Sequence, residues 1–282
     1  MRQLKVERQE GRATKNSPVK KVTKGKGISA DDTADLRSFG YGQELERSLG
    51  SFSAFAAGFS YISILTGMFQ LFYLGFATGG PTFFWSWPLV LCGQFLVALC
   101  FAELAAHFPL SGGVYQWSKY VANPGLAWMT GWIYLACLVV TLGAVAMALQ
   151  STLPQIYSGF QFIGSSASPS DAARNAVLLG CLLIGLSMAI NSVGVHFLSL
   201  INNAGVLCEL AGVVTLIGLF AAHALRSPSE AVLTVPEGGF VLSPFLAATA
   251  LTASYVMYGF DTAGSLAEET TRPRFRAPRA IL

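Results

Sequence analysis

The sequence predicts an all-α polytopic membrane protein, and two observations support this fold class. Apolar residues make up 53% of the 282 residues and charged residues only 12%, whereas a soluble domain carries about 25% charged residues. The charge is also unevenly distributed, because residues 1–50 hold 11 of the 18 Lys and Arg. Residues 51–282 therefore have too few charged side chains to cover a water-exposed surface, and lipid is the expected solvent for most of them.

The first 50 residues form a polar and basic segment. They show no apolar periodicity and contain no short apolar run of the kind found in a signal peptide, so they are predicted to be a basic cytosolic tail. Basic arms can also bind nucleic acid. In a membrane protein, attraction to an anionic lipid surface explains the charge better. We therefore expect membrane lipid, and no nucleic acid, as a partner of residues 1–50.

Six long apolar segments follow the tail, and together they define a predicted membrane domain over residues 51–282. Each has about the 20 residues that a membrane span needs. Their approximate bounds are 51–76, 83–106, 125–152, 174–193, 196–223 and 243–268. Between the second and third segments, the amphipathic stretch Val114–Ala122 follows Gly112 and Gly113, which predicts a short helix or re-entrant turn; an ordinary loop is the alternative.

The distribution of basic residues predicts the orientation of the chain in the membrane. With residues 1–50 in the cytoplasm, 16 of the 18 Lys and Arg lie on the inner side, and only Arg174 and Arg226 lie outside. The positive-inside rule favours this placement strongly. We therefore expect a cytoplasmic N-terminus, with Ser165–Ser170 and Arg226–Gly239 as outer loops.

The first and sixth segments contain residues that interrupt helices. Ser60–Gly67 is rich in hydroxyl and small side chains, and Tyr258–Ser265 includes Gly259 and Asp261. Non-helical backbone at membrane depth is tolerated only beside protein or a wet cavity. Two interrupted helices five apart in the chain are typical of the binding site of an inverted-repeat transporter. Close packing of helices through small residues is the alternative.

Two acidic residues within the apolar segments are candidates for coupling transport to a proton. Asp261 lies at the predicted break of the sixth segment, and Glu209 lies in the middle of the fifth. Acids at this depth are costly and are therefore functional candidates by default. The alternative for Glu209 is a structural acid bonded to Asn202 or Asn203, and Asp261 could likewise only bond neighbouring helices.

Several motifs in the chain resemble those of amino acid permeases of the amino acid–polyamine–organocation (APC) superfamily. They are Ser63–Phe69, Ala102–Trp117 and Gly259–Asp261 with the acidic residues that follow it. The tail piece Gly40–Arg47 resembles the choline and 4-aminobutyrate permease branch. The resemblance covers about residues 35–282. The chain departs from the usual pattern at the first break, where a leucine replaces one small residue.

The resemblance implies a LeuT-type inverted-repeat transporter fold of about twelve helices, of which this chain holds about six. These would be the first five-helix repeat and the first, broken helix of the second repeat, so we expect either a fragment or a truncated product corresponding to an N-terminal half. The implied function is secondary active transport of an amino acid or related amine (4-aminobutyrate, choline or a polyamine) across the plasma membrane, coupled to protons or exchange. A non-transporting solute sensor on the same scaffold is the alternative.

No enzyme, cofactor or metal site is expected, because the three histidines are far apart in sequence and no nucleotide or metal motif is visible. The resemblance instead implies a solute site between the two broken helices. Free N–H groups at a helix start favour a carboxylate, whereas free carbonyls and aromatic faces favour an ammonium group. By resemblance, Tyr255 takes the place of a gating aromatic, and Glu209 falls where relatives place a charged coupling group. The predicted solute-binding residues are Ser63, Thr66, Gly67, Tyr255, Tyr258 and Gly259.

Overall fold

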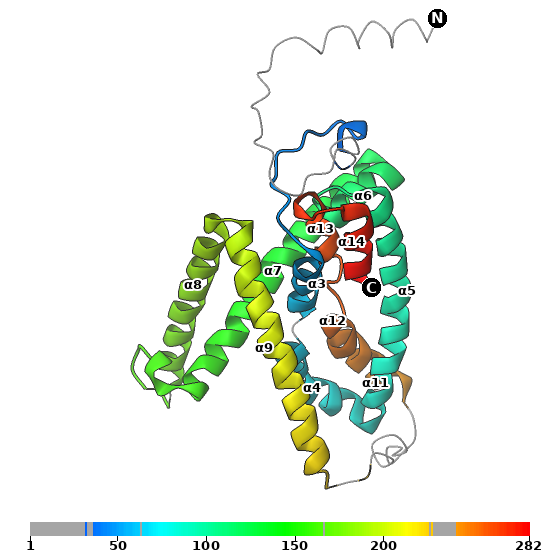
Figure 1. Cartoon of the computed structure of the whole chain (residues 1–282). Helices are drawn as coiled ribbons and strands as arrows, with labels where there is room; N and C mark the ends of the chain where they lie inside the picture. The colour runs from blue at the N-terminus through cyan, green and yellow to red at the C-terminus, as the bar shows by residue number, and fades with distance from the viewer. Residues whose placement is uncertain (1–31, 33–35, 63, 166, 226, 228–240) are drawn as a thin grey trace, which may run out of the picture.

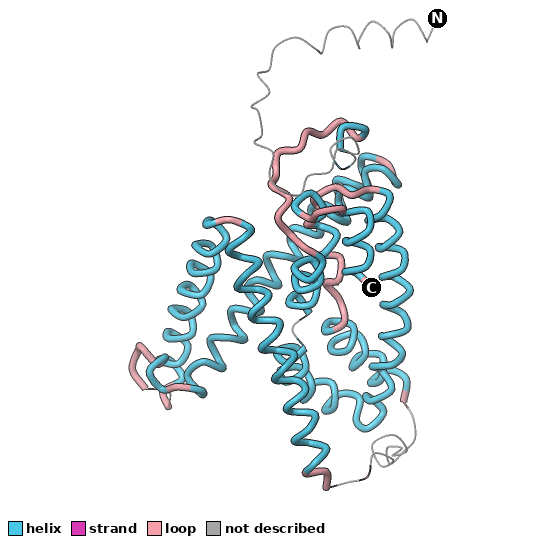
Figure 2. The backbone as a smooth tube through the Cα atoms, viewed as in Figure 1, coloured by secondary structure: helices cyan, strands magenta, loops and turns pink. Residues whose placement is uncertain are grey.

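The computed structural model describes residues 32, 36–62, 64–165, 167–225, 227 and 241–282 (Figures 1 and 2). Within these residues every secondary-structure element is a helix, apart from an isolated backbone bridge between Leu49 and Thr270. The predicted all-α class is therefore confirmed. Helices are expected where lipid is the solvent, because the backbone N–H and C=O groups of a helix form hydrogen bonds within the helix itself.

Four helical stretches are long and apolar enough to cross a membrane, and they correspond to the second to fifth predicted segments. They are Leu71–His107, which ends in α5 (Ser86–His107), then α7 (Pro124–Ile156), α8 (Pro169–Val193) and α9 (Val195–Ala222). Figure 1 shows α8 at one edge of the molecule and α5 at the other. These helices expose many large apolar side chains, as expected of surfaces that face lipid or further protein.

Of the two segments predicted to be broken, the sixth is broken within the described residues. The first is helical on both sides of Ser63, as α3 (Ser51–Ile62) and α4 (Ile64–Gly79), and is followed by the 3₁₀ helix Gly80–Trp85; its predicted break falls on Ser63, which lies outside the described residues. The sixth runs through α11 (Leu242–Ala248), a π-helical turn (Thr249–Ala253), α12 (Ser254–Val256), α13 (Thr262–Ser265) and a 3₁₀ turn (Ala267–Glu269). Residues 257–261 between α12 and α13 are not helical. Because π-helical turns often mark functional sites, the irregular sixth segment is where a binding site is expected.

The predicted short helix after the second span is also confirmed, as α6 (Gly113–Val121). The turn into α6 needs glycine, because Gly112 has a φ of 99° and Gly113 a φ of 44°. The turn out of it is set by Asn123, whose side chain accepts a hydrogen bond from the Leu126 N–H and so caps α7.

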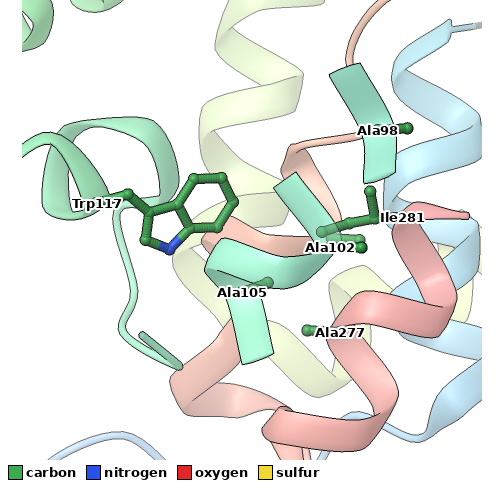
Figure 3. Close-up of a cluster of buried hydrophobic side chains, with 7 residues drawn as sticks. Ala98, Ala102, Ala105, Trp117, Ala277 and Ile281 are labelled. Carbon is green, nitrogen blue, oxygen red and sulfur yellow. The ribbon is translucent and has the colours of Figure 1, made fainter. Parts of the chain in front are cut away.

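A cluster of buried hydrophobic side chains, drawn in Figure 3, joins α5, α6, α13 and α14, which lie together toward one end of the molecule in Figure 1. There α14 (Pro273–Ile281) packs against the alanine face of α5, and the Trp117 ring of α6 closes the cluster. A Cβ added to Gly264 of α13 would lie 2.8 Å from that ring. Small residues therefore let α5, α6, α13 and α14 approach closely, which fixes the second half of the sixth segment in place. The buried cluster consists of Ala98, Ala102, Ala105, Trp117, Ala263, Ala277 and Ile281.

Candidate functional site

The first and sixth segments meet at Gly259. This residue has a φ of 104°, a conformation that L residues avoid, and a Cβ added to it would overlap the ring of Tyr61 at the end of α3. A second close approach joins α4 and α12, because a Cβ added to Gly67 of α4 would lie 3.1 Å from a methyl group of Val256. The absence of two side chains is thus what allows the first segment to cross the sixth close to the break of the sixth.

Tyr258 joins three helical segments at this crossing. Its hydroxyl lies 3.4 Å from the Tyr61 hydroxyl of α3 and 3.2 Å from the Thr141 hydroxyl of α7, both within hydrogen-bond range. The Tyr61 and Tyr258 rings are nearly perpendicular, with centroids 5.5 Å apart, and the Tyr255 ring centroid lies 5.7 Å from that of Tyr258. The arrangement gathers three tyrosine rings beside the break, and the hydroxyls of Tyr61 and Thr141 both lie within hydrogen-bond range of the Tyr258 hydroxyl.

Asp261 is the acid at this site, and α7 holds it. Only 8% of Asp261 is exposed, and its Oδ2 accepts a hydrogen bond of 2.8 Å from the Tyr134 hydroxyl. Its backbone carbonyl accepts hydrogen bonds from Gly264 and Ser265 in the first turn of the resumed helix. A buried carboxylate with a hydroxyl donor forms a strong hydrogen bond. Asp261 therefore connects the break of the sixth segment to α7.

The sequence analysis did not include Tyr134 and Thr141, which are the site residues contributed by α7. A signal for them was present, because the two hydroxyl residues lie seven apart in an apolar helix and so share one face. Tyr134 also lines an apolar cavity of about 410 Å³ between α6 and α7, which is therefore adjacent to Asp261. The cavity is lined by Gly112, Tyr115, Trp128, Gly131, Trp132, Tyr134, Leu135 and Leu138.

Of the predicted residues of the first segment, Thr66 and Gly67 lie in α4. Ser63 lies between α3 and α4 and outside the residues that the structure describes, as does the side chain of Thr66. The helix start predicted near Thr66 and Gly67 therefore stays a prediction.

The predicted residues of the sixth segment lie on both sides of the point where its first half ends. Tyr255 is in α12, which ends at Val256, and its side chain is 43% exposed. Tyr258 and Gly259 lie in the non-helical stretch beyond α12. The structure thus brings Tyr258, Gly259 and Asp261 together with Tyr61, while Gly67 contacts the preceding half of the segment.

Glu209 lies on a different element from Asp261. It is half-buried on α9, which packs against α3 and α8. On the same helix, the Asn203 side chain donates a hydrogen bond of 3.0 Å to the Ser53 hydroxyl of α3. Asp261 directly contacts Tyr134 of α7 and lies three residues after Tyr258.

The end of the sixth segment is held by the turn that leads into α6. The Glu268 carboxylate accepts a hydrogen bond of 3.0 Å from the Ser111 N–H, and the Gly112 N–H donates to the Ser265 carbonyl at 3.3 Å. Burial raises the pKa of the Glu269 carboxyl, and the neighbouring Glu268 carboxylate raises it further. Among the residues that the structure describes, no group of three or more His, Cys, Asp or Glu side chains could hold a metal ion.

Comparison with known proteins shows the family to which this chain belongs. A family model described as amino acid permease matches residues 49–282. The chain is 29% identical over 262 residues to the amino-acid permease BAT1 of Arabidopsis thaliana, covering 88% of this chain and 50% of that protein. It is 29% identical to the methylthioribose transporter of Bacillus subtilis, covering 85% of this chain and 52% of that protein, and 26% identical to the branched-chain amino acid permease BcaP of the same organism, covering 85% and 51%.

The chain spans about half the length of the curated relatives it matches. No solved structure matches it significantly. The names of the relatives describe permeases and transporters, which agrees with the expectation that the protein is not an enzyme.

Proposed function

We infer the function from the premise that this chain belongs to the amino acid permease family, whose model matches residues 49–282. We propose that the protein performs secondary active transport of an amino acid or a related amine. The observation that carries the proposal is the crossing of the first segment with the broken sixth segment at Gly259, with the buried acid Asp261 beside it. Broken helices that expose backbone groups at membrane depth are how transporters of this kind bind charged solutes.

Complementary groups for the two ends of an amino acid support this proposal. At the predicted break of the first segment, Thr66 and Gly67 would offer N–H groups and the positive end of a helix dipole to a carboxylate. The end of α12 at Val256 offers carbonyl groups to an ammonium. The rings of Tyr255 and Tyr258 add aromatic faces that attract a cation.

We further propose that the transporter is coupled to protons or to solute exchange, with Asp261 or Glu209 as the coupling acid. The resemblance of Gly40–Arg47 to the choline and 4-aminobutyrate branch supports a solute that carries an ammonium or quaternary ammonium group. The proposed location is the plasma membrane, with residues 1–50 in the cytoplasm. The alternative is a sensor that binds the same solutes without moving them.

Uptake into proteoliposomes tests this function. Vesicles with the purified complete protein, including the helices expected beyond the first repeat, are offered radiolabelled amino acids, 4-aminobutyrate, choline and a polyamine, with and without an imposed proton gradient, and protein-free vesicles are the control. Saturable uptake of at least one amine is the expected result. Because one relative is named a methylthioribose transporter, methylthioribose belongs in the panel, and uptake of it alone would contradict the amine class. Saturable binding without uptake would favour the sensor.

Impermeant labelling of single cysteines tests the orientation. In a background in which the five native cysteines are replaced by alanine, Ser38→Cys and Ser165→Cys place one thiol at each proposed face. Ser165 is exposed in the turn between α7 and α8, and Ser38 is exposed in the tail. We expect intact cells to label Ser165→Cys, and to label Ser38→Cys only after permeabilisation, because the basic segment stays inside. The opposite pattern would contradict the proposed orientation.

A further inference from the structure

Residues 41–49, here called the anchor segment, connect the basic tail to α3 and also contact the far end of the sixth segment. Within the anchor segment, Arg47 is only 3% exposed. Its Nη1 donates a hydrogen bond of 2.9 Å to the Thr270 carbonyl, and its Nε donates one of 2.9 Å to the Gln43 side-chain oxygen. A buried guanidinium is costly unless its donors are satisfied, so this contact is a specific one.

Backbone hydrogen bonds strengthen the same contact. The Leu49 N–H donates to the Glu269 carbonyl at 2.9 Å, and the Thr271 N–H donates to the Leu49 carbonyl at 3.1 Å. Thr270, which lies between these two partners, is completely buried. The anchor segment and residues 269–271 are therefore paired through main chain as well as through Arg47.

The other end of the anchor segment is attached to α6. The Lys119 ammonium donates a hydrogen bond of 3.2 Å to the Tyr41 hydroxyl, and this bond raises the pKa of Lys119. Gln43 Nε2 also donates to the Glu268 carbonyl at 3.4 Å. Since Glu268 is itself held by Ser111, the anchor segment and the turn before α6 hold the end of the sixth segment from two directions.

The contacts between α3 and the sixth segment form a continuous series from the anchor segment to the solute site. Leu49 pairs with the residues around Thr270, a Cβ added to Gly58 would lie 3.6 Å from the Ala263 Cβ, and Tyr61 packs on Tyr258. Thr270 lies only nine positions after Asp261 in the sequence. A displacement at the anchor segment would therefore be transmitted to the break at Gly259.

We propose that Arg47 is a positioning residue that holds α3 and residues 258–271 together as one unit throughout transport. The inference rests on the proposed function, and it extends that function to a part of the chain outside the solute site. Arg47 touches no solute. It acts by fixing how α3 lies against the resumed half of the sixth segment, and through that the position of Gly259 and Asp261.

Substitution of Arg47 tests the positioning role in proteoliposomes. Arg47→Ala is expected to raise the KM for solute uptake about tenfold, while the maximal rate per folded protein changes much less. This factor corresponds to loss of the charged hydrogen bond to the Thr270 carbonyl, which is the one of the two Arg47 bonds described above that joins the anchor segment to the sixth segment. Arg47→Lys keeps one charged donor and should restore part of the affinity. Arg37→Ala is the matched control, because Arg37 is an exposed tail residue with the same charge. An unchanged KM in Arg47→Ala would overturn the proposal.

A reversible cross-link tests whether the two segments stay together. Leu49→Cys combined with Thr270→Cys, in the cysteine-free background, is expected to form a disulfide that leaves solute uptake unimpaired, because the pair does not separate. Loss of uptake that dithiothreitol reverses would overturn the proposal, since the contact would then be a gate that has to open.

The yield of the same cross-link gives a readout that does not depend on transport. Addition of Arg47→Ala should lower the yield severalfold relative to Arg37→Ala, because the two segments lose their side-chain link. Equal yields would overturn the positioning role even in a protein that moves none of the solutes. Failure of the wild type to transport the panel would contradict the proposed function alone.

Discussion

Gly259→Ala is expected to reduce solute uptake by about a hundredfold or more, the largest effect of any single methyl group in the site. The residue has a φ of 104°, and the added Cβ would overlap the Tyr61 ring. Forcing an L residue into a left-handed conformation costs about 1–2 kcal/mol, and overfilling a packed contact costs about 1–3 kcal/mol more. The crossing of the first and sixth segments has to shift to accommodate both, which displaces Tyr258 and Asp261 from their partners on α7.

Gly58→Ala is the matched control for this variant. It adds the same methyl group to the same pair of segments, where the nearest atoms would lie at 3.6 Å, an ordinary van der Waals contact. Uptake by Gly58→Ala should stay within about twofold of wild type, since no atom has to move. Both proteins are compared at equal folded amounts, measured by size-exclusion chromatography. Wild-type uptake by folded Gly259→Ala would show that the close approach at the break is not required for transport.

Asp261→Asn is expected to abolish the response of uptake to an imposed proton gradient while solute binding is retained. Asparagine keeps the size of the side chain and an oxygen that can accept the Tyr134 hydrogen bond, but it cannot bind or release a proton. Asp261 is the more strongly favoured of the two candidate acids because it is buried at the break and bonded to α7. Binding is measured by calorimetry in detergent, and accumulation is measured in vesicles at several imposed gradients.

Two further variants make the result specific. Glu209→Gln removes the titratable group on α9 and should leave the gradient response intact. Tyr134→Phe removes the hydrogen bond to Asp261 but keeps the acid, so it should lower solute affinity and preserve the response. If Glu209→Gln loses the response and Asp261→Asn retains it, the coupling role moves to Glu209. If both retain it, neither acid couples transport to protons.

The amino-acid sequence alone was sufficient to predict the parts of this protein that depend on local chemistry. The spans of α5, α7, α8 and α9 follow from uninterrupted apolar runs, because a helix in lipid needs only its own residues to satisfy its backbone. The break near Gly259 could also be predicted, because glycine and an acid in the middle of an apolar run disfavour a regular helix. The short helix α6 follows from its flanking glycines and its amphipathic pattern.

Only the tertiary structure decided which residues complete the site. Tyr134 and Asp261 are 127 positions apart, and Arg47 and the Thr270 carbonyl are 223 apart. An apolar pattern reports whether a residue faces lipid or protein, but it does not report which residue lies opposite on another helix. That depends on where the helices cross, and here the crossing is set by the space that Gly259 and Gly67 leave for Tyr61 and Val256.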